Sequence, residues 1–335
     1  MKYIEQRDKE TLARLEKLRT ELPPFCGAFF LATTETTTPL TRMNYAFDLR
    51  KFFRYMTQNS EHFLDKPLAE ITEADIDQIT AHDIELYTEW MRTSPATKQR
   101  RLSSLRAFFA FLFKRDMISK NVLPLVDLPK LKDKTITRLE RDEVAKIIDL
   151  PHSEHELTQG QLRFTGKTAL RDQTILTLFL ATGVRISELV GLNLDDIDLK
   201  NSSFRIIRKG GAEAILFMPP ELCDQMVEYM ESLGTAKMDD TPLFKSIQGK
   251  RICVRAVQNM VKKYAKIVAP LKNISPHKLR STFGTQLYRN TQDIYVVAEV
   301  LGHKDVNTTK KHYAAMSEEI RKKAAAGFRL REEER

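Results

Sequence analysis

Six residues in the second part of the chain have side chains suited to phosphate chemistry: Arg185, Lys209, His277, Arg280, His303 and Tyr313. Arginine and lysine bind phosphate oxygens through charged donors, histidine transfers protons near neutral pH, and tyrosine has a nucleophilic hydroxyl. His277 and Arg280 lie three positions apart at the start of a predicted helix. Both side chains therefore project from one side of a helix N-terminus, which favours an anion such as phosphate.

Several of these residues have a simpler interpretation when each is taken alone. Arg185 follows a glycine turn among apolar residues, where a guanidinium needs an anionic partner, and Glu188 is a candidate for a purely structural pair. Lys209 falls in a predicted hairpin turn, where a lysine is usually solvated. A lone histidine or tyrosine is also usually structural, so the inference depends on the whole set.

The elements around these residues predict a mainly α-helical protein of two domains. Residues 1–130 are predicted to form helices over 2–22, 40–56, 72–90 and 94–113. Thr72 and Asp75 form a capping pattern, and Ser94 before Pro95 suits an N-cap. Residues 131–137 belong to a proline-containing stretch without periodicity and are predicted to be a linker.

Residues 138–335 are predicted to form a second domain, mostly helical with a small antiparallel hairpin. A helix is expected over 140–150, a surface loop over 152–166, and two buried helices with a tight turn over 171–192. The alternation over 204–218 predicts the hairpin. Further helices are expected over 220–234, 255–268, 278–289, 293–301 and 317–328.

The charge distribution favours a polyanionic partner. The chain has 54 Lys and Arg against 45 Asp and Glu, a formal charge of +9. Residues 241–292 contain eleven Lys and Arg and no acid, which indicates nucleic-acid contact more than a solvated face of mixed charge. Lys98, Arg100 and Arg101 crowd the first turns of a predicted helix, where a phosphate would relieve their repulsion from the helix dipole.

Three cysteines without metal-ligand spacing indicate free thiols in a reducing cytoplasm. We expect neither a signal peptide nor a membrane span, since no apolar stretch is long enough.

The ordered set of motifs resembles the tyrosine recombinase and phage integrase family. A-T-G-x-R-I-S-E-L contains Arg185, H-x-L-R contains His277 and Arg280, and L-G-H contains His303 before Tyr313. These motifs, with the Lys209 hairpin, span the second domain. The first domain is similar to the family's SAM-like core-binding domain around residues 41–53 and 95–113.

The resemblance implies how the six residues act on DNA. Tyr313 would attack a phosphodiester, Arg185 and Arg280 would hold the phosphorane oxygens, and His303 would add a donor. His277 would accept the phenol proton, and Lys209 would protonate the leaving 5′ oxygen. No metal or other cofactor is required. Two departures from the family pattern stand out: residues 210–214 lack a further basic residue, and the gap from His303 to Tyr313 is one residue longer than in many members.

The resemblance also implies double-stranded DNA as the partner, bound as a homotetramer through the C-terminal helix. That helix packs on its own domain in the alternative interpretation. Expected DNA contacts are Thr41, Arg42, Lys98, Arg100, Arg101, Arg106, Arg251, Arg255, Lys262 and Lys263.

The size and two-domain layout look most like Xer-type recombinases, which resolve chromosome or plasmid dimers through a Holliday junction. A mobile-element integrase of the same family is the near alternative. A type IB topoisomerase and a catalytically silent DNA-binding protein are more distant ones, and the complete set of six residues disfavours the silent protein.

Overall fold

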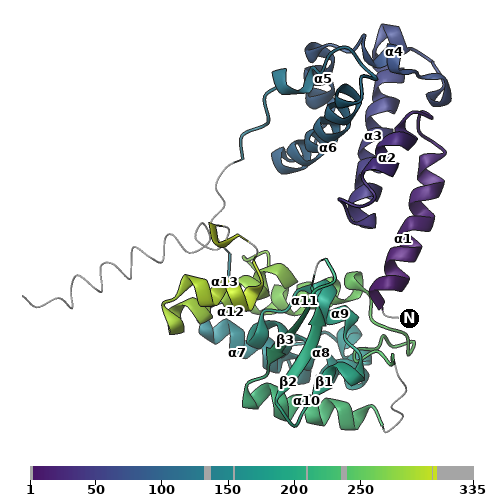
Figure 1. Ribbon diagram of the computed structural model, residues 1–335. Helices are drawn as coiled ribbons and strands as arrows, with labels where there is room; N and C mark the ends of the chain where they lie inside the picture. Colours follow the sequence, from purple (N-terminus) through teal and green to yellow (C-terminus); the bar gives the residue numbers. More distant parts are fainter. Residues whose placement is uncertain are drawn as a thin grey trace, which may run out of the picture. The chain divides into compact units, whose positions relative to one another are not determined.

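The computed structural model describes residues 3–131, 137–153, 155–208, 210–234, 240–303 and 305–307. The chain divides into two compact units, Met1–Lys134 and Thr135–Arg335 (Figure 1). Of the expected linker 131–137, residues 132–136 lie outside the described residues, as do Lys209, Tyr313 and the helix expected over 317–328.

The regular structure described in the N-terminal unit is helical. It consists of α1 (Tyr3–Arg19), α2 (Cys26–Ala32), α3 (Pro39–Asn59), α4 (Glu73–Ile76), α5 (Ala81–Trp90) and α6 (Pro95–Lys114), with the short 3-10 helices η1 (Glu61–Phe63), η2 (Leu68–Glu70) and η3 (Leu123–Leu125).

The core of this unit lies where α3 packs against α6 (Figure 1). Phe53 of α3 meets Phe108 of α6 edge to face, with ring centroids 6.2 Å apart, and both side chains are fully buried. Leu15 and Leu18 of α1 belong to the same core. Burial of each such side chain contributes roughly 1.5–3 kcal/mol, so the apolar stripes that predicted α3 and α6 also stabilise their packing.

The helix predicted over 72–90 is wrong as a single element. α4 ends at Ile76 and α5 begins at Ala81, because a second capping pair follows the first. Asp83 accepts the Thr80 backbone N–H at 2.8 Å, just as Asp75 accepts that of Thr72 at 2.7 Å. Helix α2 was not predicted, since its seven residues are nearly all apolar and show no periodic polar face.

The C-terminal unit combines helices with a three-stranded sheet. Its elements are α7 (Arg141–Asp149), η4 (Leu150–His152), α8 (Gln159–Thr182), α9 (Ile186–Gly191), η5 (Leu194–Asp196), β1 (Ile197–Asp198), β2 (Ser203–Ile207), β3 (Glu213–Phe217), α10 (Pro220–Ser232), α11 (Val254–Val268), α12 (Pro276–Thr291) and α13 (Ile294–Leu301). The sheet is antiparallel in the order β1-β2-β3, and Ser203 pairs with Phe217 in the hairpin.

Helix α8 runs through the core of this unit and packs against α7, α10 and α12. The surface loop expected over 152–166 is wrong from Gln159 onward, because the polar, glycine-containing start of α8 has no apolar stripe to mark it. The expected tight turn after α8 is confirmed: Gly183 has a φ of +63°, and a Cβ there would collide with the Phe283 ring. The turn leads directly into Arg185.

No helix among the described residues is long and apolar enough to cross a membrane.

Candidate active site

The carboxyl end of α13 is the structural centre of the candidate site. Gly302 adopts a left-handed conformation with φ +60°, and two backbone bonds close the helix there. The His303 N–H donates to the Ala298 carbonyl at 2.9 Å, and the Gly302 N–H donates to that of Glu299 at 2.8 Å. The remaining carbonyls of the last turn have no partner within the helix and accept bonds from side chains instead.

Arg185 and Arg280 meet at one of these carbonyls. Nη2 of Arg185 lies 3.2 Å from the Leu301 oxygen and 2.9 Å from the Gly302 oxygen. Arg280 also donates to the Leu301 oxygen, and its other terminal nitrogen donates to the Gly183 oxygen. The structure therefore brings together two predicted site residues from different segments, the N-cap of α9 and helix α12, directly beside His303.

Glu188 orients Arg185 without removing it from the site. Its carboxylate accepts the Arg185 backbone N–H at 2.8 Å and Nη1 of the guanidinium, also at 2.8 Å. The Glu188 side chain is buried, whereas that of Arg185 is 32% exposed and retains accessible surface. The structural pair considered from sequence thus exists, and it coexists with the contact to the end of α13.

The two histidines are close neighbours in sequence of the residues at this centre. His277 is the second residue of α12 and is exposed, while Arg280, one turn later, is buried. His303 is half-buried and follows Gly302 directly. Lys209 and Tyr313 lie outside the described residues, so the structure gives no geometry for them.

Arg208 also reaches the end of α13, although the sequence analysis did not include it in the site. Its Nη2 lies 3.2 Å from the Val300 oxygen and its Nη1 3.5 Å from the Glu299 oxygen. A helix carboxyl end carries partial negative charge, which favours guanidinium groups there. In the sequence, the neighbouring Lys209 and the glycine of L-G-H are the features that could have pointed to Arg208.

The profile of the phage integrase family matches residues 137–319, which include every residue of this site. The chain belongs to the phage integrase family. A second profile, the SAM-like N-terminal domain of phage integrases, matches residues 29–116. The predicted family is confirmed, and this tyrosine recombinase is an enzyme that cleaves and rejoins DNA.

Curated relatives are Xer recombinases. A tyrosine recombinase XerC of Caldanaerobacter subterraneus is 32% identical over 318 residues, covering 90% of this chain and 85% of the relative. XerC of Thermodesulfovibrio yellowstonii is 35% identical over 223 residues, covering 65% and 70%.

Solved structures share the fold. XerH bound to a palindromic difH substrate aligns with a TM-score of 0.63 and 21% identity, covering 87% of this chain and 80% of that one. The Tn1549 transposon integrase in complex with a circular intermediate DNA aligns with a TM-score of 0.61 and 19% identity, covering 84% and 92%.

In the recombinase's N-terminal unit, a buried carboxylate organises the basic start of α6. Arg100 contacts Asp48 of α3 with two bonds of 2.6 and 2.8 Å, and Ser104 donates to the same carboxylate at 2.7 Å. Asp48 is buried, but the Arg100 side chain is half exposed. Arg101 Nε is 3.8 Å from Asp48. Burial, and then the Arg101 charge, lower the pKa of Lys51 on the same face.

The other expected DNA contacts in this unit have differing surroundings. Arg42 is 6% exposed and donates to the carbonyls of three threonines in the loop before α3, at 2.6 to 3.4 Å. Arg106 donates to the Val126 oxygen at 2.7 Å. Thr41 contacts Thr38 at the start of α3, and Lys98 is half-buried. Arg42 and Arg106 therefore hold loops in place, which leaves Arg42 little surface for DNA.

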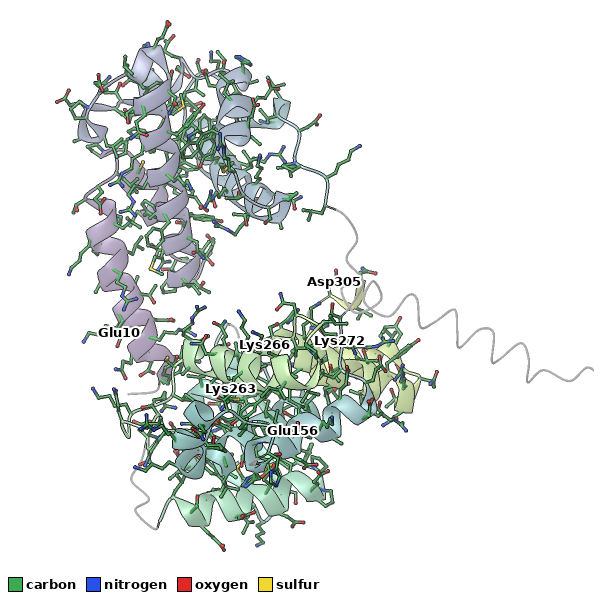
Figure 2. The ribbon with its side chains drawn as sticks, turned by 180° about the vertical axis from the view of Figure 1, so that it is seen from behind. Glu10, Glu156, Lys263, Lys266, Lys272 and Asp305 are labelled. Atoms are coloured by element: carbon green, nitrogen blue, oxygen red, sulfur yellow. The ribbon has the colours of Figure 1, made fainter. Side chains whose placement is uncertain are left out.

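Among the expected DNA contacts in the C-terminal unit, some residues contact other parts of the fold and others are exposed. Arg251 donates to the Val190 and Leu192 oxygens at 3.0 and 2.9 Å, so it joins two segments of the fold. Arg255 and Lys262 are exposed on α11. Lys263 lies on the same helix (Figure 2). Its Nζ is 3.8 Å from the buried Asp172 carboxylate and 3.9 Å from the Tyr264 ring centroid. Burial lowers the pKa of Lys263.

Proposed function

We propose that this recombinase cleaves and rejoins duplex DNA at specific sites through a 3′-phosphotyrosyl link on Tyr313 and a Holliday junction. The observation that carries the proposal is the meeting of Arg185 and Arg280 at the Leu301 carbonyl, beside His303. The role we propose is Xer-like resolution of chromosome or plasmid dimers in the cytoplasm. The XerC relative that spans most of the chain supports this role.

The proposed reaction exchanges one phosphodiester for another. The Tyr313 oxygen attacks the scissile phosphorus, His277 accepts the phenol proton, and the bond from phosphorus to the 5′ oxygen breaks. Lys209 gives a proton to that leaving oxygen. Arg185 and Arg280 stabilise the negative charge that develops on the non-bridging oxygens, with His303 as a further donor. Attack by the 5′ hydroxyl of another strand reverses these steps, so ligation needs no ATP.

We further propose that the active form is a homotetramer on DNA, joined through residues 317–335. A groove on the C-terminal unit supports this proposal, because its lining includes the apolar side chains of Leu139, Val144, Leu180 and Phe283. Residues 317–335 contain Ile320, Ala324 and Phe328 at helical spacing. The apolar stripe of such a helix is suited to an apolar groove.

A trapping experiment tests the chemistry. Binding-site selection from a random duplex library identifies the target, and a nicked suicide duplex of that sequence traps the cleaved enzyme. The parent is expected to form a covalent adduct and Tyr313→Phe none. Tyr295→Phe is the matched control, since Tyr295 is 63% exposed and lies on α13. Equal adduct from the parent and Tyr313→Phe would refute the proposal.

A plasmid with two directly repeated copies of the selected site tests the proposed role. Two smaller circles are the expected products. Relaxation of supercoils without exchange of flanking sequence would instead identify a type IB topoisomerase.

A further inference from the structure

Arg208 connects two parts of the C-terminal unit that are far apart in sequence. It follows the last residue of β2, Ile207, and its backbone closes the hairpin turn: its N–H donates to the Ala212 oxygen at 2.8 Å, and its oxygen accepts the Gly211 N–H at 3.0 Å. Its half-buried side chain reaches the last turn of α13. The turn and the carboxyl end of α13 are therefore joined through one residue.

The contact between Arg208 and the end of α13 depends on the residues on both sides. A Cβ at position 302 would overlap the Arg208 guanidinium, so the glycine of L-G-H permits the close approach as well as its own left-handed conformation. Within the described residues, Nε of Arg208 is buried without a hydrogen-bond partner. The guanidinium is thus packed between the turn and the helix end, and a shorter side chain at position 208 would not fill this space.

The end of α13 is also where Arg185 and Arg280 are held. Arg208 contacts the oxygens of Glu299 and Val300, and the other two arginines contact those of Leu301 and Gly302. The position of the β2–β3 turn is therefore set relative to the same short stretch of backbone that orients the predicted phosphate-binding arginines.

We propose that Arg208 is a positioning residue that holds the β2–β3 turn, and with it the backbone next to Lys209, against the carboxyl end of α13. This inference rests on the proposed function, in which Lys209 protonates the leaving 5′ oxygen. General acid catalysis contributes roughly 10²- to 10⁴-fold, and displacement of a reacting group by about 1 Å removes much of such a contribution. Arg208 acts only through Lys209 and does not itself contact the DNA phosphate.

A sulfur substitution in the DNA tests this role. Single-turnover cleavage is measured on two suicide duplexes, one with the normal bridging 5′ oxygen and one with sulfur there. A thiol has a much lower pKa than an alcohol, so the sulfur leaves as a thiolate without receiving a proton. Lys209→Ala is the benchmark: it should be slow on the oxygen duplex and close to the parent on the sulfur duplex.

Arg208→Ala should behave like a weaker form of Lys209→Ala. We expect cleavage of the oxygen duplex to slow by about tenfold or more, and the rate on the sulfur duplex to stay within about twofold of the parent. Arg208→Lys should show the same pattern, because the donors of an ammonium all lie on one nitrogen and do not reproduce the planar fork with which Nη1 and Nη2 reach two separate carbonyls. Arg205→Ala is the matched control on the same strand, since Arg205 contacts Asp196 at 3.1 Å, and its rates should equal those of the parent.

Two results would overturn the assignment. Parent-like cleavage of the oxygen duplex by Arg208→Ala would show that the contact has no role in the reaction. Equal slowing on both duplexes would show that Arg208 serves the fold or the arginine pair and not proton transfer. A parent enzyme that forms no adduct on either duplex would refute the proposed function itself, and the role of Arg208 with it.

Discussion

Two arginine sites, one in each unit, are held in different ways. In the N-terminal unit, the buried carboxylate of Asp48 accepts two bonds from Arg100 and one from Ser104. In the C-terminal unit, Arg185 and Arg280 converge on the backbone oxygen of Leu301. A carboxylate neutralises the charge that it orients, whereas a carbonyl at a helix end contributes only a fraction of a charge.

This difference fits the two tasks that we propose for these arginines on DNA. Binding to the DNA backbone needs phosphate contacts whose strength is moderate and reversible, and a paired arginine provides them. Stabilising a phosphorane needs nearly full positive charge in a fixed place. The backbone carbonyls of Gly183 and Leu301 hold Arg280 in place, and Glu188 supplies the carboxylate that orients Arg185.

The largest expected effect comes from the carbonyl-held arginines. Arg280→Lys keeps the charge but cannot donate to the Gly183 and Leu301 oxygens while also contacting phosphate through a fork. We expect cleavage to slow by about 10²- to 10³-fold with little change in DNA affinity. Single-turnover cleavage at saturating DNA measures this loss. A rate within tenfold of the parent would show that the geometry of the guanidinium is unimportant.

Asp48→Asn tests the arginine that is held by a carboxylate, Arg100. The amide loses the charge that accepts three bonds, so we expect the unfolding free energy to fall by about 2–3 kcal/mol, while cleavage at saturating DNA stays near the parent rate. Urea unfolding of the full chain measures the change, with the exposed Asp127→Asn as control. An unchanged unfolding free energy would show that the Asp48 carboxylate does not stabilise this unit.

The ionisation of Asp75 is expected to make the folding stability of the N-terminal unit depend on pH. Burial by itself would raise its pKa, but the bonds from Lys66 at 2.6 Å and from Thr72 outweigh burial and lower the pKa from 3.8 to about 2. Because the folded pKa lies below the unfolded one, the stabilisation is complete above about pH 4 and is lost as the pH falls through 2.

The expected contribution of Asp75 is about 2 kcal/mol. Urea unfolding measured from pH 5 down to pH 2 should show a loss of this size in the parent that is absent in Asp75→Asn. Identical pH profiles for the two proteins would contradict the assignment.

The smallest effect concerns DNA affinity. Arg100 is half exposed, so Arg100→Ala should weaken binding by about threefold and reduce the salt dependence by about one released counterion. Lys114→Ala, at the other end of α6, should leave the salt slope unchanged. Fluorescence anisotropy over a salt series measures both. An unchanged slope for Arg100→Ala would place the DNA contacts elsewhere.

Much of the fold could be predicted from periodicity and caps. The helices around Phe53 and Phe108 and the turn at Gly183 were found, because their apolar spacing and glycine have a direct structural meaning. The start of α8 was not found, because tertiary contacts stabilise a helix start that is polar in sequence. The break between α4 and α5 was not found either, because a second capping pair interrupts a pattern that looks continuous.

Motifs could identify Arg185 and Arg280, but not the backbone oxygen that joins them. Contacts between a side chain and a backbone carbonyl have no sequence signature at the carbonyl, which is why Arg208 was missed. Arg42 and Arg251 also donate to backbone oxygens, a role that their charge does not reveal, and their contact with DNA stays a prediction.

A change in the charge of the scissile phosphate tests the central claim most directly. Replacing one non-bridging oxygen by a methyl group removes a negative charge, so a carbonyl-held arginine should matter less. We predict that Arg280→Ala, nearly inactive on the phosphate duplex, forms the covalent adduct on the methylphosphonate duplex at a rate approaching that of the parent. Equal inactivity of Arg280→Ala on both duplexes would contradict the claim that Arg280 is held at the end of α13 to meet the phosphate charge.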